Sequence, residues 1–115
     1  MYKLSYSEII DGDPREGRAR EQQALDHAIA LMKKAETIGP KSPEAIEAVQ
    51  YLQKLWTFFI QNLTDPSNEL AGNLKGDLIS IGLWAINEAD RVLADQSKGF
   101  GALIDVNRTI RDGLA

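Results

Sequence analysis

The 115 residues, of which 43% are hydrophobic and 26% charged, are typical of one globular domain over positions 1–115 and exclude a disordered chain. Thirteen basic and 17 acidic residues give a net charge of −4, which disfavours direct binding to nucleic acid. The chain has no cysteine, which excludes disulfides, and no apolar run near the roughly 20 residues that span a membrane, so no membrane partner is expected.

The first ten residues, MYKLSYSEII, fit two local structures. Tyr2, Leu4 and Tyr6 alternate as in a strand, whereas Tyr6, Ile9 and Ile10 suit one helical turn. We expect a short N-terminal arm that packs on the rest of the protein or meets a partner, which makes Tyr2 and Tyr6 candidate partner-binding residues. The segment lacks the apolar core of a secretory signal, so we expect a cytoplasmic protein.

Clear end signals predict a first helix over 14–38. Asp13 is an N-cap residue, Pro14 suits the first helical position, and Glu16 suits the third. Gly39 and the proline after it end the helix, because glycine accepts the left-handed conformation and proline cannot continue a helix.

A second helix is predicted over 43–63. Ser42 is its N-cap candidate, and Pro43 suits the first helical position. Its later apolar residues span an arc of roughly 200°, whereas an ordinary surface helix needs about 100°. These residues are Tyr51, Leu52, Leu55, Trp56, Phe58, Phe59, Ile60 and Leu63. The helix is therefore either the centre of a bundle or open to a partner on one flank. We expect Trp56 in the core, and Tyr51 and Phe58 on the more exposed edge.

The segment PSNELAGN then suits one or two helical turns, and a third long helix is predicted over 74–94. Gly82 lies within its wide apolar arc and lets another helix come close. The arc comprises Leu74, Leu78, Ile79, Ile81, Leu83, Ala85, Ile86, Ala89, Val92 and Leu93. Trp84 instead lies on the polar side with Glu88, and large exposed aromatic residues often mark contact surfaces. The alternative is that the last helix or the N-terminal arm covers Trp84.

A last helix is predicted over 100–112, with Ser97 as N-cap and Gly113 after its end. Asn107 lies in the middle of its apolar face, where an unpaired amide would cost about 1–3 kcal/mol. We expect either a structural amide with its bonds satisfied or a residue that contacts a partner. Since no β-branched alternation suggests a strand, the predicted fold is an all-α bundle of about four helices with a short N-terminal arm.

The residues that catalysis needs are missing. His27 is the single histidine and has polar helix neighbours, so it reads as a surface residue rather than a base or ligand. Neither a phosphate-binding glycine loop nor a metal-ligand spacing occurs. We therefore expect no enzyme, no cofactor, no metal and no small-molecule substrate.

Three blocks of sequence resemble the bacterial flagellar biosynthesis regulator family FlaF. They are LWTFFIQNL, LISIGLW and FGALIDVNRTIRDGL, and the similarity extends over nearly the whole chain. The resemblance implies a small cytoplasmic protein that promotes flagellin production and secretion. It further implies action alongside a second regulator, FlbT, which controls flagellin messenger RNA.

The mechanism that this resemblance implies is that of a secretion chaperone. Free flagellin has terminal segments that become helical coiled coil in the filament, and an apolar groove can hold such a segment. Two alternatives stay open: regulation through FlbT without flagellin contact, and a structural homo-oligomer. The candidate partner-binding residues are Trp84, Tyr51, Phe58, Asn107, Tyr2 and Tyr6.

Overall fold

The computed structural model describes residues 14–114, with side chains from residue 17 onward, and this part of the chain contains four α-helices and no strand. The helices are α2 (Pro14–Ile38), α3 (Pro43–Thr64), α4 (Gly72–Leu93) and α5 (Gly101–Gly113). The predicted all-α fold of about four helices is confirmed. The expected N-terminal arm, with Tyr2 and Tyr6, lies outside the described residues.

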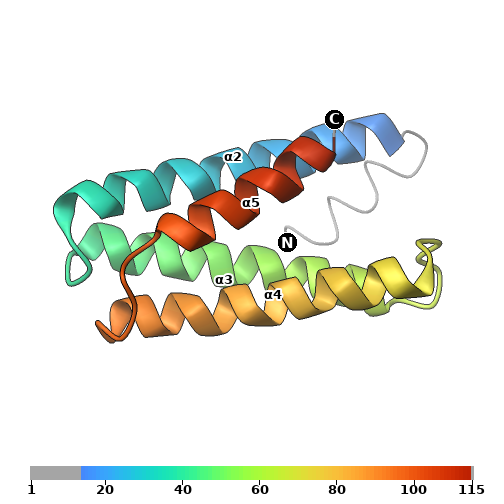
Figure 1. The fold of residues 1–115 in the computed structure, drawn as a ribbon. Helices are drawn as coiled ribbons and strands as arrows, with labels where there is room; N and C mark the ends of the chain where they lie inside the picture. The colour runs from blue at the N-terminus through green and yellow to red at the C-terminus, as the bar shows by residue number, and fades with distance from the viewer. Residues whose placement is uncertain (1–13, 115) are drawn as a thin grey trace.

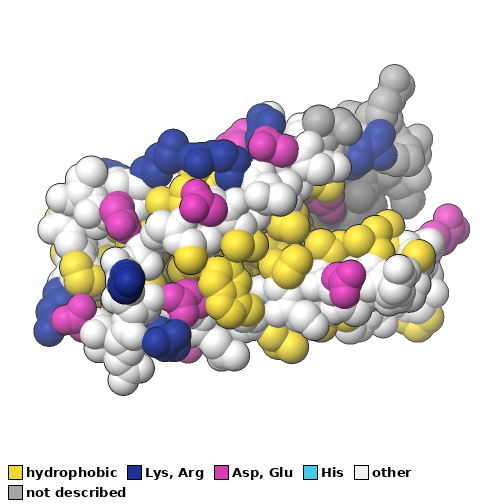
Figure 2. All heavy atoms as spheres, in the orientation of Figure 1, with side chains coloured by type: hydrophobic (Ala, Val, Ile, Leu, Met, Phe, Trp, Pro, Cys, Tyr) yellow, Lys and Arg dark blue, Asp and Glu magenta, His cyan; other side chains and the backbone are white. Residues whose placement is uncertain are grey.

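Three long helices form the body of the molecule, and each runs antiparallel to the one before it (Figure 1). α3 packs extensively against both α2 and α4. The shorter α5 packs mainly on α2 and hardly touches α4. Figure 2 shows the consequence, a band of apolar side chains left in view along the edge of α4.

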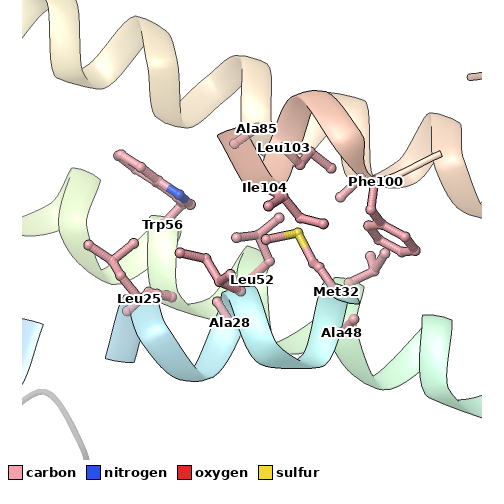
Figure 3. Close-up of a cluster of buried hydrophobic side chains, with 14 of the residues drawn as sticks. Leu25, Ala28, Met32, Ala48, Leu52, Trp56, Ala85, Phe100, Leu103 and Ile104 are labelled. Atoms are coloured by element: carbon pink, nitrogen blue, oxygen red, sulfur yellow. The ribbon is translucent and has the colours of Figure 1, made fainter. Parts of the chain in front are cut away.

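The core lies where α2, α3 and α5 meet (Figure 3). Leu25 and Met32 from α2, Leu52 from α3, and Leu103 from α5 have no accessible surface. Small residues line the seams between these helices, among them Ala28 on α2, and permit close approach. No helix within residues 14–114 is long and apolar enough to cross a membrane.

The start of α3 follows the prediction. Ser42 is its N-cap, and the Ser42 hydroxyl oxygen accepts a hydrogen bond from the Ala45 backbone N–H at 3.1 Å. Gly39, in the turn before it, has a φ of 127°, a conformation that favours glycine. Proline at the first helical position costs no hydrogen bond there.

The predicted helical turns between α3 and α4 are wrong. Residues 65–71 form turns and irregular structure, because side chains there bond the backbone locally. The Asp65 carboxylate accepts from the Ser67 backbone N–H at 2.8 Å, and the Asn68 side chain accepts from the Leu70 N–H at 3.0 Å.

Ser97 is not the N-cap of α5, as the sequence suggested. Phe100 occupies that position without a side-chain cap, and its backbone N–H donates to the Glu36 carboxylate of α2 at 2.8 Å. Ser97 lies too far before the helix and donates instead to Glu88 of α4. A tertiary contact thus replaces the local cap.

Candidate functional site

Trp84 lies on the surface of α4, as predicted, with 38% of its area exposed. No described element covers it, although α5 runs near this side of α4. A large aromatic residue with this much exposure is unusual in a small helical protein and favours a contact surface.

Trp84 has apolar neighbours on the same side of α4. Leu74 is 44% exposed, and Leu78 and Ile81 are half-buried. At about 100° per residue the four positions lie within an arc of roughly 120° and span about 15 Å. We call these four residues the α4 strip: Leu74, Leu78, Ile81 and Trp84. Leu70, just before the strip in the chain, is exposed as well.

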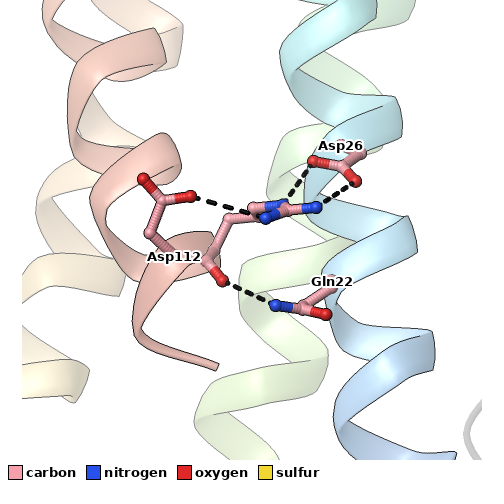
Figure 4. Close-up of polar contacts among 4 residues, drawn as sticks. Gln22, Asp26 and Asp112 are labelled. Carbon is pink, nitrogen blue, oxygen red and sulfur yellow. Dashed lines mark hydrogen bonds and ion pairs between the residues drawn. The ribbon is translucent and has the colours of Figure 1, made fainter. Parts of the chain in front are cut away.

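The strip is uncovered because α5 is shorter than α4 and its last turn is bound to α2. α5 has 13 residues and α4 has 22, or about 20 Å against about 33 Å. Polar contacts fix its last turn on α2, where the Arg111 guanidinium pairs with Asp26 at 2.8 Å and the Arg111 carbonyl accepts from Gln22 at 3.2 Å (Figure 4). The hydrogen bond and charge of Asp26 raise the pKa of Arg111. α5 therefore ends opposite 22–26 and leaves the earlier part of α2 without it.

The other end of α4 is closed. Ala85, Ala89 and Val92 are buried, and Glu88 is only 8% exposed, although the sequence placed it on the polar side. The segment between α4 and α5 folds back over this end, so Glu88 accepts hydrogen bonds from Ser97 and from Arg91, the latter at 3.0 Å. A carboxylate with both oxygens engaged is a structural group. No cluster of potential metal ligands occurs within the described residues.

The edge of α3 that carries Tyr51 and Phe58 faces α2. Tyr51 is half-buried and packs edge-on against exposed His27 at a ring distance of 4.7 Å. Phe58 is 5% exposed, so the expectation of an exposed edge is wrong for this residue. Sequence alone did not show which flank of α3 receives α2. Trp56, on the opposite edge, is in the core as predicted.

Asn107 is fully buried, and its hydrogen bonds lie inside the bundle. Its Oδ1 accepts from Trp56 Nε1 at 2.8 Å, and its Nδ2 donates to the Leu103 carbonyl at 2.7 Å. The satisfied-amide interpretation therefore fits, with a tryptophan and a helix backbone as partners. Within the described residues every buried side-chain nitrogen and oxygen has a partner.

The structure does not gather the predicted partner-binding residues at one place. Trp84 lies on α4 and Tyr51 on the seam of α2 and α3, while Phe58 and Asn107 present almost no surface to solvent. The sequence analysis counted Leu74, Leu78 and Ile81 in the apolar arc of the third helix and did not name them as candidate partner-binding residues. The available signal was the length of the last predicted helix, which is too short to cover the third one.

Comparison with known proteins gives one match. The family model described as flagellar protein FlaF matches residues 2–114, which is nearly the whole chain. Neither the curated proteins nor the solved structures contain a match. The family assignment agrees with the resemblance of the sequence blocks and implies a role in flagellum biogenesis. The chain therefore belongs to the FlaF family of flagellar proteins.

Proposed function

We propose that the protein is a non-enzymatic regulator of flagellum biogenesis that binds flagellin in the cytoplasm as a secretion chaperone and promotes its production and export. The observation that carries this proposal is the exposed α4 strip on a protein of a flagellar family. The strip is a continuous apolar surface beside the short α5, and one helix of a partner can pack on it.

A terminal segment of flagellin has the required chemistry. Such a segment is amphipathic and becomes coiled coil in the filament, so it needs a temporary apolar partner before export. Helix-in-groove binding uses anchors at spacings of three, four and seven residues, and the strip offers about three helical turns of contact. Each strip side chain that loses its remaining exposed area contributes on the order of 1 kcal/mol.

Trp84 is the main anchor in this proposal, because tryptophan is enriched among residues that dominate binding energy. We expect Trp84→Ala to weaken flagellin binding at least about tenfold, with a much smaller change in melting temperature. Isothermal titration calorimetry with full-length flagellin measures the binding affinity, and thermal unfolding measures the melting temperature. Leu83→Ala is the matched control, since Leu83 is 52% exposed on a different side of α4.

Three results would contradict the proposal. The first is an absence of heat with full-length flagellin, and the second is equal weakening by Trp84→Ala and Leu83→Ala. The third is unfolding by Trp84→Ala, which would make Trp84 a core residue.

Titration with FlbT tests the alternative function, regulation through FlbT. Binding to FlbT but not to flagellin would favour regulation without flagellin contact. Light scattering that shows a concentration-dependent dimer would favour the homo-oligomer.

A further inference from the structure

We propose that Asp77 makes the α4 strip selective for an amphipathic helix of another protein that carries a lysine or arginine beside its apolar side chains. This charge preference depends only on the residues of α4. The statement that flagellin supplies such a helix rests on the proposed function.

Asp77 lies inside the α4 strip. At about 100° per residue it is about 20° from Trp84 and about 40° from Ile81 around the helix, and Leu74 is one turn before it. The Asp77 side chain is exposed and forms no ion pair or hydrogen bond with another described residue. A helix that covers the strip must therefore cover this carboxylate as well.

The fold of α4 does not need Asp77. It is the sixth residue of the helix, whereas an acidic side chain at a helix N-terminus is favourable mainly within the first turn. A leucine at this position would have a higher helix propensity and would extend the apolar surface. The carboxylate is therefore better explained by what binds the strip than by the stability of the helix.

The basic residues of α4 do not neutralise Asp77. Lys75 precedes it by two residues and so lies on nearly the opposite side of the helix, where it donates to the Asn68 carbonyl. Arg91 is bound to Glu88 at the closed end of the helix. Asp77 is thus the one charged residue of 74–84 that lies within the arc of the strip.

The described charges on other elements at this end of the molecule have both signs. They are Arg18, Arg20 and Glu21 on α2, and Asp65 and Glu69 in the segment before α4. α2 packs on α3 and α5, and none of its basic side chains forms an ion pair with Asp77. Because Asp65 and Glu69 adjoin α4 in the chain, the negative charge lies on the α4 side.

The charge of Asp77 also decides against a second copy of this chain as the occupant. In a two-fold contact of the strip with itself, the centre lies near residue 79, so the two Asp77 residues would be only about 6 Å apart along the helix axes. Their repulsion would add to that between two chains of net charge −4. Like charges that face each other select against a wrong partner.

Covering Asp77 makes the surface selective for a physical reason. A helix with apolar side chains alone would remove the carboxylate from water without replacing its hydration, which opposes binding. A helix that places lysine or arginine there replaces the lost hydration by a charge-assisted hydrogen bond. The strip thereby rejects apolar helices that lack the cation.

Two designed peptides test the charge preference of the full-length protein. Both are amphipathic helices with the same leucine stripe, which is flanked on both edges by lysine in one peptide and by glutamate in the other. Isothermal titration calorimetry should show at least about tenfold tighter binding of the lysine peptide. Since a net charge of −4 attracts any cationic peptide, the decisive quantity is how a mutation changes this ratio of affinities.

Asp77→Leu should reduce the ratio at least about fivefold more than Glu47→Leu does. Glu47→Leu is the matched control, because it removes the same charge from an exposed position of α3. Circular dichroism checks that both variants are folded. Equal reductions in the two variants, equal affinities of the two peptides for the parent chain, or no binding of either peptide would overturn the proposal. A dimer of the parent chain that Trp84→Ala abolishes would assign the strip to a second copy and would also overturn it.

Full-length flagellin tests whether the proposed partner supplies the cation. Asp77→Leu should weaken flagellin binding at least about tenfold, whereas a purely apolar contact would be strengthened by the added leucine. Peptide selectivity without flagellin binding supports the charge preference and contradicts the proposed function. Flagellin binding without peptide selectivity has the reverse meaning. Peptide selectivity together with tighter flagellin binding by Asp77→Leu supports the charge preference and overturns flagellin as the source of the cation.

Discussion

Two stretches of α4 differ sharply in burial, although they share one side of the helix. The α4 strip holds large apolar residues that solvent reaches, with Leu74 44% exposed. The later stretch holds smaller residues, Ala85, Ala89 and Val92, which are almost completely buried. Burial here follows the presence of a neighbouring helix rather than the size of the side chain. Large apolar side chains kept outside a core are typical of an interaction surface.

The strongest test of this comparison places the same charge in both stretches. Val92→Asp should lower the free energy of unfolding by at least about 3 kcal/mol, because the carboxylate would be buried without a partner. Leu74→Asp should change it by no more than about 1 kcal/mol, since solvent reaches that position. Urea denaturation of both variants measures the difference. Similar losses in the two variants would show that the strip belongs to the core.

The two tryptophans provide a second matched pair. Trp56→Phe removes the donor to Asn107 Oδ1 and leaves that oxygen buried, so we expect a loss of about 1–3 kcal/mol. Trp84→Phe should stay within about 0.5 kcal/mol of the parent. Chemical denaturation followed by far-ultraviolet circular dichroism checks both, because it does not depend on tryptophan fluorescence. A larger loss of stability in Trp84→Phe than in Trp56→Phe would contradict the assignment of Trp56 to the core and Trp84 to the surface.

The helices were largely predictable from sequence, because their end signals are local. Ser42, Pro43 and Gly39 fixed the boundary of α2 and α3 through chemistry within a few residues. The start of α5 was predicted to within one residue, but its capping contact was not, since Glu36 binds the Phe100 N–H from 64 residues away. The family resemblance was also visible in the sequence blocks, and the match over residues 2–114 confirms it.

The candidate surface was less predictable, because periodicity shows an apolar face but not its neighbour. The exposure of Trp84 followed from its place outside the apolar arc. The exposure of Leu74 did not, since its position within that arc is equivalent to that of buried Val92. Tertiary packing distinguishes them, because Val92 lies beside the segment that joins α4 to α5, whereas α5 ends before it reaches Leu74. The Arg111–Asp26 contact that holds the end of α5 joins residues 85 positions apart.

Two glycines of α4, Gly82 and Gly76, provide a third matched pair with smaller expected effects. A Cβ at Gly82 would lie 2.7 Å from Cε3 of the buried Trp56 ring, whereas one at Gly76 would meet nothing within 4 Å. Gly82→Ala should lower the free energy of unfolding by about 0.5–2 kcal/mol, because the cost of overpacking exceeds the gain in helix propensity. Gly76→Ala should stabilise by about 0.5–1 kcal/mol, since only the propensity acts. Thermal unfolding of the pair should show opposite signs, and equal signs would contradict the close packing of α3 and α4.

The smallest expected effect concerns the contact that holds the start of α5 on α2. Glu36→Ala removes the acceptor for the Phe100 N–H and should destabilise by about 0.5–1.5 kcal/mol. Glu47→Ala, at an exposed position of α3, is the control and should be nearly neutral. Hydrogen exchange is the decisive measurement, because loosening the start of α5 should speed exchange at Leu103 and Ile104 more than within α3. If α5 instead keeps its protection in Glu36→Ala, then packing alone holds it in place, and the uncovered strip follows from helix length rather than from this contact.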